Sequence, residues 1–332
     1  MRIERGEKAV AQDGLGPSDP ELRQVVQAWV AAGGPTAVES VVELSGGLYN
    51  SCFQLMTTRG DRAVVRVAPA EADQRPSELH LMRNEYASVP FLRPIADLIP
   101  STLFADFTHQ IIDRDYLIQS HLEGVPASRL LSSWSEANQQ LFWTCLGSIL
   151  ARVHSTTCDR FGRLSNPSAR SWSACLADGF DLIATGCDQL GVDATDLRVV
   201  ADLVRTTHGD ALEQITTGHL LHGDLIPANV MIDPVHPERG IIGVFDTDRT
   251  WWGDPAADWT FTFIDRCSDN ARQAFWSGYG HDLPSDGAAQ QRGLLYRVRA
   301  LGEIRLEYAR LARPAKLQET YIKARALIAQ LG

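Results

Sequence analysis

The chain has 332 residues, of which 44% are hydrophobic and 22% charged, as expected of a folded protein large enough for two lobes. Its net charge of −10 disfavours a nucleic-acid partner, and no apolar run approaches the roughly 20 residues of a membrane-spanning helix. The 6 cysteines show no CxxC spacing, which favours free thiols over zinc ligands or disulfides. Because residues 1–8 lack an apolar core, we expect no secretory signal and a cytoplasmic location.

The first third of the sequence is predicted to be rich in strands. Residues 1–18 are polar and Gly-rich, so we expect an irregular lead-in, followed by a helix with Asp19 as N-cap and Pro20 in its first turn. The expected elements are this helix over 19–34, two strands around a glycine turn within 41–55, a strand over 62–67, a helix near 78–89, and strands near 101–107 and 115–119.

The remainder of the chain is predicted to be mainly helical. Residues 123–126 contain Gly and Pro and indicate a linker, and a helix is expected over 135–155. Two short strands, near 230–233 and 241–245, interrupt the helical pattern. We therefore predict an α+β fold with two lobes, residues 1–122 and residues 123–332.

One segment carries the pattern of phosphoryl transfer. His222-Gly223-Asp224 is followed four residues later by Asn229, and a predicted hairpin then ends at Asp246. Phosphoryl transfer requires an acceptor hydroxyl held in line and a neutralised phosphate charge. Asp224 could accept the hydroxyl proton, and Asn229 and Asp246 are oxygen ligands suited to Mg²⁺. Alone, Asp224 could equally be a turn residue, but the three residues at these spacings favour catalysis.

These motifs resemble the aminoglycoside phosphotransferase family, which shares a protein-kinase-like fold with choline, homoserine and fructosamine kinases. The segment from His222 to Asn229 matches its HGDxxxxN signature, and Gly253-Asp254-Pro255-x-x-Asp258 matches its GDPxxD segment. The resemblance implies a two-lobed fold with a β-rich nucleotide-binding lobe and a helical catalytic lobe. It also implies Asp224 as the base, Asn229 and Asp246 as Mg²⁺ ligands, and ATP or GTP as the phosphate donor.

The nucleotide side of the predicted site begins at a glycine turn. The backbone of Ser45, Gly46, Gly47 and Asn50 could approach phosphate groups, although a plain hairpin would show the same pattern. By resemblance, the Ser120 carbonyl and the Leu122 N–H would bind the nucleotide base at the hinge between the lobes.

A cation is also expected on the strand over 62–67. The chain has only three lysines, at positions 8, 316 and 323, so Arg66 stands where kinase-like proteins carry lysine. Arg is always charged and can bind phosphate through two hydrogen bonds. Its expected partner on the following helix is Glu85, with Glu78 as the alternative.

The acceptor molecule is less defined by the sequence. Residues 176–270 carry a net charge of −12, which suits a cation, whereas residues 271–332 carry +5, which argues against a polycationic aminoglycoside. Candidate acceptor-binding residues are Asp248, Trp252, Asp254, Asp265, Glu303 and Glu307.

Three functions remain open at this point. The first is an O-phosphotransferase that modifies an antibiotic, such as a nucleoside, macrolide or peptide. The second is a metabolic kinase acting on homoserine, choline or a sugar, and the third is a non-catalytic nucleotide-binding relative, which the complete Asp224, Asn229 and Asp246 set disfavours. We expect a monomer or homodimer with no membrane or nucleic-acid partner.

Overall fold

A computed structural model describes residues 1–6, 16–35, 37–44, 49–165, 167 and 169–331. These residues form two compact units. The N-terminal unit comprises Met1–Tyr86 and Ile99–Leu122, and the C-terminal unit comprises Ala87–Leu98 and Glu123–Gly332. The predicted lobes, residues 1–122 and 123–332, stay a prediction, and residues 87–98 cluster with the C-terminal unit.

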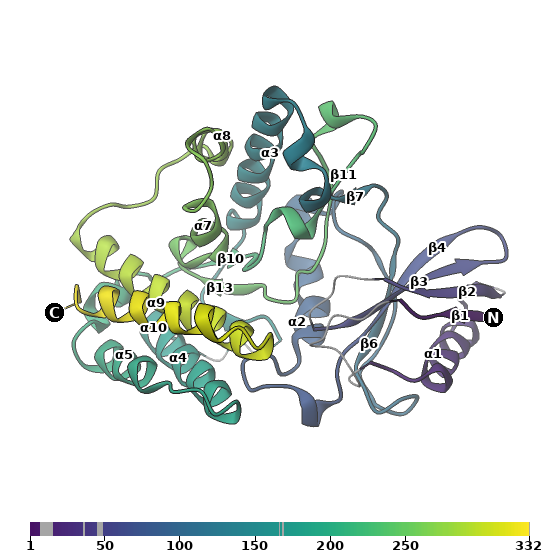
Figure 1. The fold of residues 1–332 in the computed structure, drawn as a ribbon, viewed down its shortest axis with the longest axis horizontal. Helices are drawn as coiled ribbons and strands as arrows, with labels where there is room; N and C mark the ends of the chain where they lie inside the picture. Colours follow the sequence, from purple (N-terminus) through teal and green to yellow (C-terminus); the bar gives the residue numbers. More distant parts are fainter. Residues whose placement is uncertain (7–15, 36, 45–48, 166, 168, 332) are drawn as a thin grey trace. The chain divides into compact units, whose positions relative to one another are not determined.

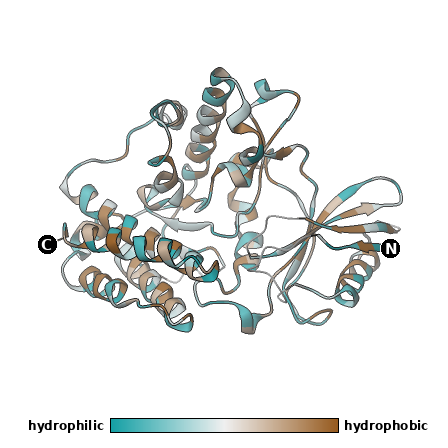
Figure 2. Ribbon diagram, in the orientation of Figure 1, coloured by the Kyte–Doolittle hydropathy of each residue, from teal (hydrophilic) through white to brown (hydrophobic). Residues whose placement is uncertain are grey.

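The N-terminal unit is built on a six-stranded sheet with the strand order β1-β2-β3-β4-β6-β5. Its elements are β1 (Arg2–Glu4), α1 (Asp19–Ala31), β2 (Val38–Glu43), β3 (Ser51–Thr57), β4 (Arg62–Val67), α2 (Leu81–Ser88), β5 (Thr102–Asp106) and β6 (Tyr116–Ser120). Leu22, Val25 and Trp29 of α1 share a buried core with residues of the sheet. Figure 2 shows both hydrophobic and hydrophilic residues on α1, as expected of a helix that buries one face.

The start of the N-terminal unit differs from the prediction in two ways. The N-cap of α1 is Ser18, one residue before the predicted Asp19: the Ser18 hydroxyl accepts the Glu21 N–H (3.4 Å), and Glu21 accepts the Ser18 N–H (2.7 Å). The expected irregular lead-in is also wrong at β1, which pairs in parallel with Ser40–Val42 of β2. Pairing with a distant strand is invisible in local composition.

The C-terminal unit is mainly helical and contains two small sheets. Its helices are α3 (Glu136–His154), α4 (Trp172–Gln189), α5 (Thr195–Thr206), α6 (Gly209–Glu213), α7 (Trp259–Ile264), α8 (Asp269–Tyr279), α9 (Gly287–Arg310) and α10 (Pro314–Ile328). One sheet has the order β8 (Thr157–Cys158), β10 (Gly218–Leu221), β13 (Trp251–Gly253), β9 (Gly162–Arg163). The other has the order β12 (Ile241–Val244), β11 (Val230–Ile232), β7 (Val125–Pro126). Helices α4, α5, α9 and α10 pack side by side (Figure 1) and contribute a large hydrophobic core.

The predicted α+β class is confirmed by this arrangement of a strand-rich and a helix-rich unit. The expected strands near 230–233 and 241–245 are β11 and β12, which pair antiparallel. The prediction missed β10 and β13: these strands have four and three residues, and their pairing partners lie far along the chain. Among the described residues, none of the helices has both the length and the apolar character needed to span a bilayer.

Candidate active site

The loop between β10 and β11 carries the first two candidate residues, Asp224 and Asn229. Gly223 has φ +77°, and a Cβ atom there would lie 2.4 Å from the carbonyl oxygen of Arg249. The loop can therefore approach the Arg249 main chain only if residue 223 is glycine. This contact explains why glycine precedes Asp224 in the motif.

A single carboxylate, that of Asp258, holds the start of this loop. Its Oδ2 accepts hydrogen bonds from the backbone N–H groups of His222 (2.9 Å) and Gly223 (3.3 Å) and lies 3.2 Å from Nε2 of His154. Burial raises the pKa of Asp258, but the interactions with His154 and Thr260 outweigh it and bring the pKa down to about 2. The charged form of Asp258 is thus the one that fixes the loop.

Asp224 has a different environment. The Asn229 amide donates to the Asp224 side chain (Oδ2, 2.8 Å) and to its carbonyl oxygen (2.9 Å). Burial raises the pKa of Asp224 to about 7; Asp246 adds to this effect, and Arg249 opposes it. A carboxylate with a pKa near the working pH is well suited to accept a proton from a hydroxyl group.

The hairpin β11–β12 brings Asn229 and Asp246 to the same end of one ribbon. Val230 pairs with Val244, and the Phe245 N–H donates to the Asn229 carbonyl oxygen (3.0 Å). Asp246, directly after Phe245, has φ +63°, a strained conformation for a non-glycine residue. Strain of this kind is typical of functional sites, although it does not itself assign a role.

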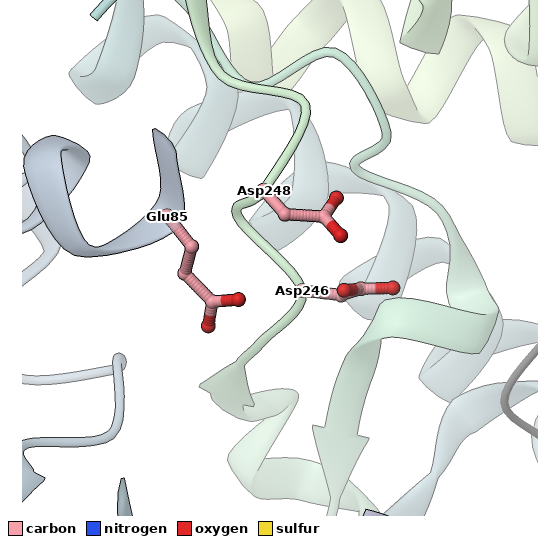
Figure 3. A group of neighbouring side chains, drawn as sticks. All are labelled: Glu85, Asp246 and Asp248. Carbon is pink, nitrogen blue, oxygen red and sulfur yellow. The ribbon is translucent and has the colours of Figure 1, made fainter. Parts of the chain in front are cut away.

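The oxygen atoms at this end of the hairpin fit a hard cation. Asp246 and Asp248 lie two residues apart on the loop after β12 (Figure 3), and their carboxylates approach within 4.8 Å. Because the Asn229 amide nitrogen is engaged with Asp224, its Oδ1 is the atom that can ligate a cation. An all-oxygen set of this kind suits Mg²⁺.

The N-terminal unit contains a buried ion pair at the predicted cation position. Arg66 of β4 donates from Nη1 to both carboxylate oxygens of Glu85 on α2, at 2.6 and 2.5 Å. Gln119 of β6 also donates to Glu85 (2.9 Å). The alternative partner, Glu78, lies 3.7 Å from Arg75. Sequence reasoning thus identified a strand–helix pair that the fold brings together.

The structure gives fewer contacts for the other residues that were predicted to bind the nucleotide. Ser45, Gly46 and Gly47 lie outside the described residues, while Asn50 is buried directly before β3. Ser120 ends β6, where its hydroxyl accepts the Ser101 N–H (2.9 Å), and Leu122 follows two residues later. Their contacts with a nucleotide stay predictions.

The candidate acceptor residues occupy very different environments. Trp252 is a core residue that packs edge-on against Phe91, and Asp254 is buried and accepts hydrogen bonds from Arg292 (3.2 Å) and Tyr296 (2.7 Å). These contacts give both residues structural roles and disfavour acceptor binding. The rest are distributed as follows: Asp248 is buried beside Asp246, Asp265 and Glu307 are exposed, and Glu303 pairs with Arg299 (3.0 Å).

Sequence reasoning missed the basic residue beside Asp224. Arg249 follows Asp248 directly, and its charge lowers the pKa of Asp224. No motif or spacing distinguishes it from the other arginines of the chain. In the sequence, only its position between Asp246 and β13 indicates that Arg249 lies near the candidate site.

Comparisons with known proteins agree with this geometry. Residues 40–294 match the model of the phosphotransferase enzyme family. A search of curated proteins finds no match. Among solved structures, the chain is similar to a thermostable mutant of the aminoglycoside phosphotransferase APH(4)-Ia, with a TM-score of 0.62 at 18% identity, covering 93% of this chain and 98% of that one.

Two further structures show the same likeness. A ternary complex of an APH(4)-Ia variant with AMP-PNP and hygromycin B gives a TM-score of 0.59 at 18% identity, covering 92% of this chain and 98% of the other. A putative aminoglycoside phosphotransferase from Ralstonia eutropha gives 0.60 at 14% identity, covering 92% and 95%. The expected protein-kinase-like α+β fold is confirmed, and the chain belongs to the phosphotransferase enzyme family, as a small-molecule kinase.

Proposed function

We propose that this protein is a Mg²⁺-dependent O-phosphotransferase that moves the γ-phosphoryl group of ATP or GTP to a hydroxyl group of a small molecule. We propose further that this small molecule is an antibiotic. The observation that carries the proposal is the loop in which Asn229 binds the Asp224 carboxylate while the β11–β12 ribbon holds Asp246 at the same end. The acceptor hydroxyl would give its proton to Asp224 as its oxygen bonds to the γ-phosphorus, while the bond from that phosphorus to the β,γ-bridging oxygen breaks and ADP or GDP leaves.

The other residues of the proposed site position charge. Asn229 Oδ1 and the Asp246 carboxylate would hold Mg²⁺, with Asp248 as a further oxygen donor; when bound, the ion supplies neutralisation of phosphate charge. Asn229 also orients the Asp224 carboxylate through its amide. In the N-terminal unit, Arg66 would contact phosphate oxygens, and Glu85 would hold its guanidinium in place. Asn50 and the hinge residues Ser120 and Leu122 would bind the nucleotide.

The similarity of the fold to antibiotic-modifying phosphotransferases favours an antibiotic as the acceptor. The APH(4)-Ia variant described above was solved with hygromycin B and an ATP analogue, and this chain shares its fold over nearly its whole length. The alternative acceptors are homoserine, choline or a sugar. No residue of the described site selects among these, so the acceptor must be found by assay.

The test is a transfer assay that compares the wild-type protein with Asp224→Asn. Purified protein, Mg²⁺ and ATP or GTP are incubated with a panel of hydroxylated antibiotics and metabolites, and products are analysed by mass spectrometry for the gain of one phosphate. Expression in a susceptible host shows whether modification protects the cell. Phosphorylation of metabolites alone, without resistance, would exclude the antibiotic. Product formed equally well by Asp224→Asn protein would remove Asp224 from the role of base.

A further inference from the structure

Helix α2, which carries Glu85, is attached to the sheet of the N-terminal unit by a small set of side chains. It has 8 residues, too few for a helix to be stable without tertiary contacts. Its Met82 packs with Ala68 and Leu117 in a small buried cluster. Because this apolar contact is small, polar side chains must supply much of the positioning of α2 on the sheet.

Two polar attachments tie α2 to the sheet. The first is the ion pair of Glu85 with Arg66, to which Gln119 of β6 adds a hydrogen bond. The second starts two residues earlier on the helix. Arg83 donates from Nε to Oδ2 of Asp115 (2.8 Å) and from Nη2 to Oδ1 (2.8 Å), so both carboxylate oxygens are bound. Charge-assisted pairs with this two-pronged geometry are strong and directional.

Asp115 is a fixed point at the edge of β6. It directly precedes the strand, its side chain is buried, and its carbonyl oxygen accepts the Ala68 N–H (2.9 Å). His109 Nε2 lies 2.9 Å from Asp115 Oδ1, and the Phe107 ring centre lies 5.9 Å from the Arg83 guanidinium carbon. The loop between β5 and β6 thus holds the acid in place and packs against the arginine.

The two attachments constrain α2 in different directions. Side chains two residues apart on a helix point to different sides of it, so Arg83 and Glu85 reach the sheet separately. Their partners at β6, Asp115 and Gln119, are four residues apart, which is roughly 13 Å along an extended strand. One attachment would let the helix turn about its own axis, whereas two attachments at this separation oppose that rotation.

The orientation of α2 determines whether Glu85 can hold Arg66. The hydrogen bonds between these two side chains measure 2.5 and 2.6 Å, and a displacement of about 1 Å would break them. Arg83 binds the loop between β5 and β6 instead, so it can act on Arg66 only through the helix.

We propose that Arg83 and Asp115 are positioning residues of the nucleotide site: their ion pair fixes α2 so that Glu85 orients Arg66 toward the phosphate groups. The inference rests on the proposed function and adds to it two residues that act without touching the nucleotide or the acceptor. A purely structural pair would change the free energy of unfolding alone. A positioning pair must also change nucleotide affinity, and must do so through Arg66.

The test measures the affinity of the purified protein for Mg²⁺ and AMP-PNP by calorimetry. Arg83→Gln and Asp115→Asn should each weaken binding about fivefold to tenfold, because Arg66 then makes its charge-assisted contact with phosphate only part of the time. Arg83→Lys, which keeps the charge but loses the two-pronged geometry, should weaken binding less. In protein that carries Glu85→Gln with Arg66→Met, the guanidinium to be positioned is absent, so adding Arg83→Gln should weaken binding less than about twofold.

Asp19→Asn is the matched control. Asp19 of α1 also binds an arginine of the N-terminal unit, Arg5 (2.6 Å), but α1 carries none of the residues predicted to bind the nucleotide. This substitution should leave the affinity for AMP-PNP unchanged.

Three results would overturn the inference. They are unchanged affinity in folded Arg83→Gln or Asp115→Asn protein, an equal loss of affinity with and without the Arg66–Glu85 pair, and full affinity after Glu85→Gln with Arg66→Met. If Arg83→Gln protein does not fold, Asp115→Asn takes its place in both backgrounds. Failure of the wild-type protein to bind AMP-PNP would instead overturn the proposed function.

Discussion

The Arg66–Glu85 pair of the N-terminal unit and the Asp224 loop of the C-terminal unit both bury charge, but in opposite ways. Glu85 receives two hydrogen bonds from Arg66 and one from Gln119, so its negative charge is matched directly. Asp224 receives a neutral amide donor from Asn229, and the nearest opposing charge, that of Arg249, lowers its pKa without cancelling the effect of burial. Its pKa is correspondingly raised to about 7, mainly by burial.

This difference in charge compensation distinguishes a pair that stabilises the fold from a carboxylate that could take part in catalysis. A buried carboxylate with a matching guanidinium resists protonation and fixes two elements to each other. A partly buried carboxylate without a directly paired cation, such as Asp224, is held at a cost in free energy, which the rest of the structure must offset. Substitutions in the two regions should therefore move activity and stability in different directions.

The largest effect is expected from Asp224→Asn. Loss of the base should lower kcat by roughly 10³-fold, within the range for general base catalysis, while the nucleotide Kd changes little. Because the charged form of Asp224 is destabilised by burial, the same substitution should leave the free energy of unfolding equal or raise it by on the order of 1 kcal/mol. Single-turnover phosphate transfer and urea denaturation measure the two quantities.

Glu238→Gln provides the control for that comparison, since Glu238 is an exposed acid in the turn of the same β11–β12 hairpin. It should change neither kcat nor stability measurably. If Asp224→Asn instead unfolds the protein, Asp224 is a structural residue and the contrast with Glu85 disappears.

The next largest effect is expected at the Arg66–Glu85 ion pair. Glu85→Gln leaves Arg66 buried with its charge uncompensated, which should lower the free energy of unfolding by about 3 kcal/mol. The double variant Glu85→Gln with Arg66→Met removes both charges and should recover at least half of that loss. A double-mutant cycle by chemical denaturation gives the coupling energy. Equal losses in the single and double variants would mean that the pair contributes through packing alone.

A smaller, pH-dependent effect is expected at Asp258. Its pKa is lowered to about 2 in the folded state, from a usual value of 3.8, so its stabilising contribution is complete above pH 3.8 and is lost as pH falls through about 2. The difference in unfolding free energy between wild type and Asp258→Asn should shrink by on the order of 2 kcal/mol over this window. Denaturation series at several pH values measure it. A difference independent of pH would show that Asp258 anchors the loop without its charge.

How far the sequence predicts this site depends on the distance between its parts. Asp224, Asn229 and Asp246 lie on one loop and one hairpin, so spacing alone places them together. Arg66 and Glu85 were predicted from the resemblance to kinase-like proteins, which pair a basic residue on this strand with a glutamate on the next helix. Arg249, in contrast, acts on Asp224 from the loop before β13, a proximity that only the tertiary fold creates.

The prediction of the fold likewise succeeds for local patterns and fails for contacts between distant parts of the sequence. The strand over 62–67 was predicted to the residue, because its β-branched residues are a local signal, whereas β1 depends on pairing with β2, for example Arg2 with Ser40. The contacts of Trp252 and Asp254 could not be predicted for the same reason: their partners, Phe91, Arg292 and Tyr296, lie far along the chain. From residue type, Trp252 could line an acceptor site or pack in the core, and its contacts favour the core.

The smallest effect is expected from Arg66→Lys, which tests whether the Arg66–Glu85 ion pair requires arginine. Lysine keeps the positive charge but has a single ammonium in place of the planar fork, so it can still neutralise Glu85 with fewer hydrogen bonds. We expect the free energy of unfolding to fall by about 1 kcal/mol and the nucleotide KM to rise less than about tenfold. Denaturation and steady-state kinetics measure both. A loss as large as that of Glu85→Gln would show that the pair depends on the geometry of the guanidinium and not on its charge, and arginine on β4 would then be a requirement of this fold rather than a replacement for lysine.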